Sequence, residues 1–126
     1  MLVEEINVTS LLKAFNKFEI FRVNNHNEQE KTGTILAFSY CFELGWRMMQ
    51  QLLEERGKIT YSPRETFKLA ASEGIIEDPE LWFEFLDKRN LATQTYQENE
   101  LETILSMLPK FSMEIKNFLH SVGYAA

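Results

Sequence analysis

Residues 34–57 read TILAFSYCFELGWRMMQQLLEERG and carry the strongest helical pattern of the chain. The main apolar stripe of this stretch recurs at three- and four-residue spacing, at Ile35, Phe38, Phe42, Gly45, Trp46, Met49, Leu52 and Leu53. This spacing predicts one long helix with a buried face, and Gly57 stands where a C′ glycine ends a helix. Leu36, Tyr40 and Leu44 form a second apolar line beside the stripe. The second line indicates either a homodimer interface or a central place in a bundle.

Helical periodicity continues on both sides of this stretch. Apolar positions predict a first helix over about residues 9–23 and a last helix over about residues 98–122. Residues 24–33 are rich in Asn, Glu and Gln and are expected to form a polar connection.

Two further helix starts are marked by capping residues. Ser62, Pro63 and Glu65 combine a capping serine, a proline at the first helical position and a glutamate at the third, and they predict a short helix that ends near Gly74. Asp78 followed by proline predicts another start. The chain is therefore expected to be all-α, an antiparallel up-and-down bundle of four main helices plus a short helix, in a single domain over residues 1–126.

Composition limits the classes of protein that this chain can be. At 126 residues, with 44% hydrophobic and 25% charged residues, it can bury a core and is too short for a two-domain enzyme. No apolar run approaches the about 18 residues needed to cross a bilayer, and the one cysteine, Cys41, cannot form an internal disulfide. We expect a cytoplasmic protein without a membrane partner, in which Ser39 and Cys41 serve packing and not catalysis.

The net charge of −6 argues against binding to duplex DNA through a broad basic face, although it leaves room for a local anion site. Acidic residues gather at positions 77–87, as Glu77, Asp78, Glu80, Glu84 and Asp87. This cluster is either a solvated helix face or a docking surface for a basic partner. Neither zinc-type Cys and His spacing nor a phosphate-binding glycine loop is present, so we expect no metal and no cofactor.

One residue does not fit its helix. At 100° per residue, Arg89 lies inside the apolar arc that Leu81, Trp82 and Phe85 define. A guanidinium cannot lose its charge, so it must meet an acceptor. Either Arg89 pairs inside the bundle, with Glu43 as the candidate partner, or it snorkels to water, or it forms the floor of a cleft and offers its planar fork to a phosphate.

Arg89 also opens the segment RNLATQTY at residues 89–96, and this segment resembles the signature of the nucleotidyltransferase substrate-binding family. That family lies within the superfamily of higher eukaryotes and prokaryotes nucleotide-binding (HEPN) domains. Three more stretches resemble it in the expected order, FELGW at 42–46, SPRE at 62–65 and GIIED at 74–78 followed by Trp82. With the residues that flank them, the four stretches carry the resemblance over about residues 35–108.

The resemblance implies a homodimeric helical bundle that works beside a small, separately encoded nucleotidyltransferase, in many relatives as a toxin and antitoxin. The family's catalytic motif is Arg, a polar residue, three or four variable residues and His, with Tyr two further on. Arg89, Asn90 and Tyr96 match this motif, but Gln94 stands in place of the histidine. A carboxamide does not titrate and cannot move the proton of a 2′-hydroxyl, so we expect ribonuclease activity to be very weak or absent. His26 and His120 are expected to be surface histidines that do not replace it.

Three hypotheses follow. The first is a non-catalytic partner subunit of a minimal nucleotidyltransferase, which binds a nucleotide, an RNA phosphate or another substrate at a dimer-associated cleft through Arg89, Asn90 and Gln94. The resemblance implies that Tyr96 is the hydroxyl that receives AMP from the transferase, and the alternative is an ordinary half-buried tyrosine at the edge of the bundle. The second is a degenerate HEPN ribonuclease toxin with weak RNA cleavage, and the third is a stand-alone helical adaptor with Arg89 merely paired inside the bundle.

Overall fold

A computed structural model describes residues 8–94 and 98–123, apart from the side chains at positions 94, 98 and 99. Over these ranges the secondary structure is helical, with no strand, which confirms the predicted all-α class. The five helices are α1 (Val8–Arg22), α2 (Glu28–Glu55), α3 (Pro63–Ser72), α4 (Pro79–Gln94) and α5 (Glu98–Ser121).

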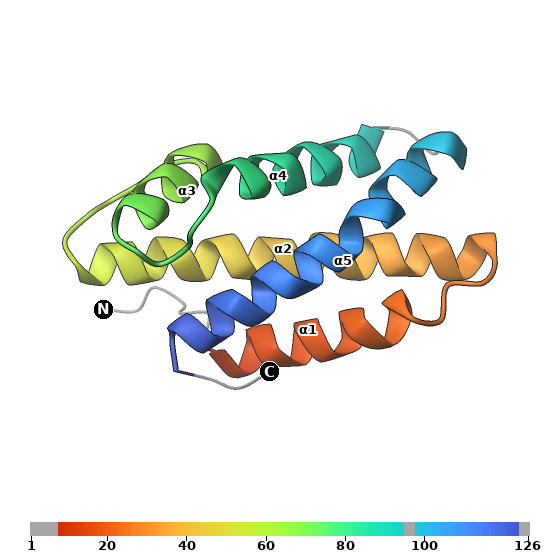
Figure 1. Cartoon of the computed structure of the whole chain (residues 1–126), viewed down its shortest axis with the longest axis horizontal. Helices are drawn as coiled ribbons and strands as arrows, with labels where there is room; N and C mark the ends of the chain where they lie inside the picture. The colour runs from red at the N-terminus through yellow and green to blue at the C-terminus, as the bar shows by residue number, and fades with distance from the viewer. Residues whose placement is uncertain (1–7, 95–97, 124–126) are drawn as a thin grey trace.

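Helix α2 is the centre of the bundle and contacts each of the other four helices. In Figure 1, α1 and α4 lie on opposite sides of α2, and α5 crosses over α2 in front. Successive long helices run in opposite directions, and the short α3 packs at the end of α2 where α4 begins. The antiparallel up-and-down arrangement is therefore as predicted.

The start of α2 differs from the prediction. The helix begins at Glu28, six residues before the predicted start at Thr34. Asn27 caps it by accepting a hydrogen bond from the Glu30 amide at 2.8 Å, while the Glu30 carboxylate accepts one from the amide of His26. The polar composition of residues 28–33 had indicated a loop, but it belongs to the solvated first turns of a capped helix.

The other two capped starts are where the sequence places them. Ser62 accepts a hydrogen bond from the Glu65 amide at 3.2 Å, and Glu65 reaches back to the amide of Tyr61 instead of that of the cap itself. Asp78 accepts from the amide of Glu80 at 2.9 Å. These local bonds satisfy amides that a helix start leaves without a partner.

A cluster of aromatic rings fills the middle of the core. Phe111 of α5 packs against rings from three other helices, with centroid separations between 4.8 and 6.5 Å, namely Phe18, Phe38, Phe42, Trp82 and Phe85. Three of these pairs are edge-to-face at 5.3 Å or less, a geometry that aromatic quadrupoles favour. Phe111 therefore joins α5 to α1, α2 and α4 at one point.

Gly45 lies where α2 faces α5 and α4. A Cβ atom at this position would lie 3.3 Å from Ile115 Cδ1 and 4.0 Å from Trp82. The absence of a side chain at Gly45 thus lets α5 approach α2 closely. The glycine of the FELGW stretch therefore serves helix packing and not a turn.

The second apolar line of α2 divides between core and surface. Leu44 is buried, in agreement with a central position for the helix, whereas Leu36 and Tyr40 are 72% and 60% exposed. None of the helices in the described part of the chain has the length and apolar character that a bilayer crossing requires.

Candidate functional site

Arg89 on α4 meets Glu43 on α2 across the helix pair. Its Nη1 atom donates a hydrogen bond to Glu43 Oε1 at 2.8 Å. Only 23% of the Arg89 side chain and 30% of the Glu43 side chain are exposed. The structure thus brings together the two residues that the sequence offered as an ion pair, and Arg89 does not extend freely into water.

Asn90 and Phe42 contact this guanidinium, and Arg47 binds the same carboxylate as Arg89. Arg89 Nε donates to Oδ1 of Asn90 at 3.2 Å, and its Cζ atom lies 5.4 Å from the centroid of the Phe42 ring. Arg47, one turn after Glu43, donates from Nε to Glu43 Oε2 at 2.6 Å. We call Glu43, Arg47, Arg89 and Asn90 the arginine cluster.

Electrostatics hold the carboxylate of the arginine cluster in its charged form. Partial burial by itself raises the pKa of Glu43, but interactions with Arg47, then with Trp46 and then with Arg89 outweigh burial and leave the pKa below its ordinary value. Two guanidinium groups share one carboxylate, so the arginine cluster keeps an excess of one positive charge.

This excess charge determines what the arginine cluster can bind. A guanidinium has five N–H donors, and two of those on Arg89 are used by Glu43 and Asn90. An incoming phosphate can take the remaining edge of the fork, but to use the whole fork it must compete with Glu43. Asn90 turns its amide oxygen to Arg89, so it supports the arginine and was not anticipated in that role.

Two side chains of the predicted motif lie outside the described residues. Gln94 is the last residue of α4, and its side chain lies outside the described residues, as does Tyr96. The site that the structure describes is therefore the Arg89 and Asn90 half of the motif together with two partners on α2.

Comparison with known proteins decides the family. The family model described as "Nucleotidyltransferase substrate binding protein like" matches residues 6–123, which is nearly the whole chain. The chain belongs to this family. This match confirms the resemblance seen in the four short stretches. The arginine cluster therefore lies in a member of the nucleotidyltransferase substrate binding protein-like family.

Relatives of this family member share both length and fold. The curated protein "Probable ribonuclease HepT" of Haemophilus influenzae is 22% identical over 131 residues, with 90% of each chain covered. A crystal structure from Thermus thermophilus has a TM-score of 0.84 at 25% identity and covers 90% of this chain and 99% of its own. A Haemophilus influenzae structure, described as revealing the fold of a substrate binding domain of a nucleotidyltransferase, has a TM-score of 0.85 at 21% identity, covering 94% and 100%.

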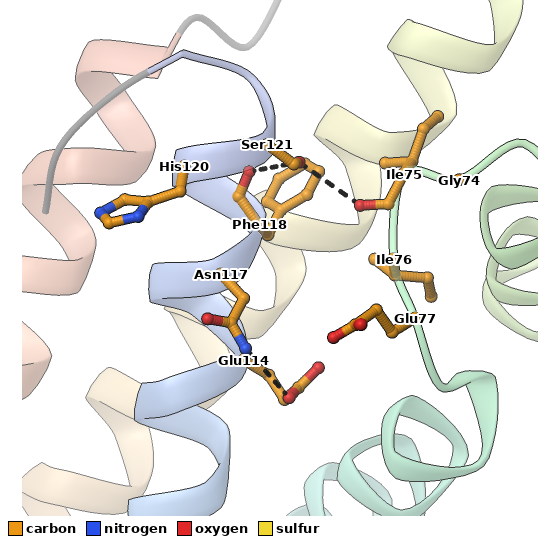
Figure 2. Close-up of a pocket in the computed structure, with 9 residues that line it drawn as sticks. All are labelled: Gly74, Ile75, Ile76, Glu77, Glu114, Asn117, Phe118, His120 and Ser121. Atoms are coloured by element: carbon orange, nitrogen blue, oxygen red, sulfur yellow. Dashed lines mark hydrogen bonds between the residues drawn. The ribbon is translucent and has the colours of Figure 1, made fainter.

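A separate pocket of this family member, about 350 Å³ in volume, lies between the loop before α4 and the end of α5. Figure 2 shows the carboxylates of Glu77 and Glu114 pointing into it, while the imidazole of His120 turns away. Burial, with repulsion from Glu77 and Asp78, raises the pKa of Glu114. His120 lines this pocket beside the two carboxylates and is not one of the residues of the arginine cluster.

Sequence reasoning missed Arg47 and Phe42 as partners at the site. A signal for Arg47 was present, since Glu43 and Arg47 are four residues apart on one helix, the spacing at which side chains pair. No comparable signal predicted the contact between Phe42 and Arg89. A helical wheel shows the direction of each side chain on one helix, but it does not show which residues of another helix lie opposite.

Proposed function

We propose that this chain is the non-catalytic partner subunit of a small nucleotidyltransferase. Membership of the substrate binding protein-like family over residues 6–123 supports this function, and it is the observation that carries the proposal. The arginine cluster adds a positively charged, partly exposed set of hydrogen-bond donors. Its role is to hold a nucleotide, an RNA phosphate or another anionic substrate for the transferase.

Absence of a titrating group argues for binding without cleavage. Gln94 stands where the family motif has histidine, and a carboxamide cannot act as a general acid or base. Glu43 is also a poor base, because its two arginine partners keep its pKa low. An Arg89-centred site of this kind orients a phosphate and leaves it intact.

The proposal includes modification of Tyr96. If the chain is the substrate of its partner in a toxin and antitoxin pair, its hydroxyl at Tyr96 accepts AMP from ATP, and pyrophosphate leaves. In this reaction the Tyr96 oxygen forms a bond to the α-phosphorus, the bond between the α- and β-phosphates breaks, and the phenolic proton goes to solvent.

Co-expression tests the partner role directly. The chain is expressed with the product of the reading frame next to its own gene, provided that frame encodes a small nucleotidyltransferase. We expect the two to copurify, and incubation with ATP to add the mass of one AMP to this chain but not to its Tyr96→Phe variant. A chain that neither binds the transferase nor becomes labelled is better described as a stand-alone adaptor.

Weak RNA cleavage is the second candidate function. It is favoured by the likeness to a relative whose name includes ribonuclease, and by Arg89 and Asn90 at the start of the motif. We expect the purified chain to leave single-stranded RNA intact, and Gln94→His to introduce cleavage that is lost again on Arg89→Ala. Robust cleavage by the unmodified chain that disappears with Arg89→Ala would establish a ribonuclease instead.

We also propose that the chain is a homodimer and that it acts in the cytoplasm. Exposed Leu36 on α2 supports association, because a large aliphatic side chain in water favours burial against a second surface. Light scattering on the purified chain tests the dimer, since a mass near 14.8 kDa would identify a monomer.

A further inference from the structure

A second pocket lies on the side of the bundle formed by α1 and α2. It measures about 370 Å³ and is lined by Lys13, Lys17 and two smaller residues of α1, and by Ala37 and Tyr40 of α2. This volume falls within the range of about 300–1,000 Å³ that small-molecule sites occupy. We call it the lysine pocket.

Two neighbouring cations without a carboxylate partner mark the lysine pocket. Within the described residues, seven of the thirteen cationic side chains form ion pairs, and these are Arg22, Lys31, Arg47, Arg56, Lys58, Arg64 and Arg89. Of the six that form none there, Lys13 and Lys17 are the pair that stands four positions apart on one helix. No carboxylate lies three or four positions away from either lysine, and the one carboxylate of α1, Glu19, is paired with Arg22.

The two lysines also repel each other. Residues four apart on a helix lie on the same face, and like charges at that spacing destabilise the helix. In a chain of net charge −6, a pair of neighbouring cations without a carboxylate partner forms a local positive site. A dianion is the ligand whose charge balances them.

Tyr40 supplies a flat surface at the edge of the same pocket. Its ring is 60% exposed, and Ala14 and Ala37 beside it are small enough to leave space over the ring. Exposed aromatic side chains stack with nucleobases, and this stacking contributes to affinity without depending on base sequence. Phosphate-binding cations next to an exposed ring match a ligand that has a phosphate and an aromatic base.

We propose that the lysine pocket binds a nucleoside monophosphate, with the phosphate between Lys13 and Lys17 and the base on Tyr40. A terminal phosphate carries a charge of about −1.5 to −2 near neutral pH, which two ammonium groups neutralise. A long nucleic acid fits less well, because the chain as a whole is acidic. This site is separate from the arginine cluster and does not depend on the function proposed above.

Calorimetric titration of the full chain with AMP tests this site. We expect saturable binding that weakens as salt is added, and about tenfold or greater loss of affinity in the double variant Lys13→Met with Lys17→Met. The matched control is Lys68→Met with Lys110→Met, which removes two exposed lysines elsewhere and should leave affinity within about twofold. Circular dichroism establishes that each variant is folded.

Further variants and ligands test which residues form the site and which part of AMP is bound. Tyr40→Leu should weaken AMP binding while Tyr40→Phe retains it, and adenosine and inorganic phosphate should each bind more weakly than AMP. Equal AMP affinity of the Lys13/Lys17 double variant and its control overturns the proposal. So does loss of binding with Arg89→Met, which would place the ligand at the arginine cluster, or a preference for an acidic peptide or an RNA oligonucleotide over AMP.

Discussion

The guanidinium of Arg89 and the carboxylate of Glu43, 46 residues apart in the sequence, meet at 2.8 Å between α4 and α2. The same carboxylate receives Arg47 on its other oxygen. The Glu43 carboxylate therefore forms ion pairs with two arginines, and its pair with Arg89 joins α2 to α4. Both the stability of this helix pair and the availability of Arg89 to a ligand depend on Glu43.

Replacing Glu43 tests that dependence. Glu43→Gln should lower the free energy of unfolding by about 1 kcal/mol near neutral pH, because two arginines lose their charged acceptor. The folded-state pKa of Glu43 lies below its ordinary value of 4.5, so the ionised carboxylate stabilises the fold above 4.5. That contribution is lost as the pH falls through the lowered pKa.

Urea unfolding of the wild type and Glu43→Gln at several pH values measures this effect. The stability difference should be largest near neutral pH and disappear well below 4.5. Glu102→Gln is the control, since its ion pair with Lys31 is more exposed and contributes less. A stability difference that stayed constant with pH would show that Glu43 acts by shape and not by charge.

Glu114 should behave in the opposite way. Burial and the neighbouring Glu77 and Asp78 raise its pKa, so the folded state binds the proton more tightly than the unfolded chain does. Its protonated form contributes stability below 4.5, and this contribution is lost as the pH rises through the raised pKa. Glu114→Gln should therefore stabilise the protein near neutral pH, by less than about 1 kcal/mol because the group is partly solvated.

Thermal unfolding followed by circular dichroism at neutral and acidic pH checks the Glu114 prediction. The stability that Glu114→Gln gains over the wild type at neutral pH should vanish at low pH. Glu77→Gln should give a smaller gain at neutral pH, because it removes one charge that repels Glu114. A loss of stability at neutral pH in Glu114→Gln would contradict the assigned sign.

Phe111 is expected to be the most sensitive apolar position of α5. Phe111→Ala removes a ring that contacts α1, α2 and α4 and should cost about 3–5 kcal/mol, enough to unfold a marginally stable domain. Met113, two residues later and 56% exposed, is the control, and Met113→Ala should change stability by less than about 0.5 kcal/mol. Denaturant midpoints compare the two, and similar costs would contradict the central role of Phe111.

The Cys41 thiol should be inert while the chain is folded. It is fully buried on α2, and burial raises its pKa, so almost no thiolate is present near neutral pH. A thiol reagent such as DTNB should react with the protein only as fast as it unfolds, and rapidly in denaturant. Fast reaction with the native protein would show that α2 is more accessible than its packing indicates.

Most of the helix boundaries could be predicted because local chemistry marks them. Ser62 and Asp78 carry capping oxygens, and Gly57 adopts a positive φ of 80° after α2, where glycine is favoured. The start of α2 was missed because a solvated first turn and a loop share the same polar residues. Asn27 followed by Glu30 was the signal that distinguishes them.

The site was only partly predictable for a different reason. Arg89 could be recognised from one helix alone, because it interrupts an apolar arc. Its partners depend on how α4 is rotated against α2, and periodicity does not determine that rotation. Glu43 was therefore one candidate among open alternatives, and the contact with Phe42 was not anticipated.

The capped helix starts have a consequence for the speed of folding. Hydrogen bonds at Asn27, Ser62 and Asp78 join residues only two or three positions apart, so they can form before distant segments of the chain meet. Helical domains dominated by such short-range contacts fold within microseconds to milliseconds. We expect rapid refolding of this chain in a stopped-flow experiment, with the search for the correct arrangement of preformed helices as the slow step.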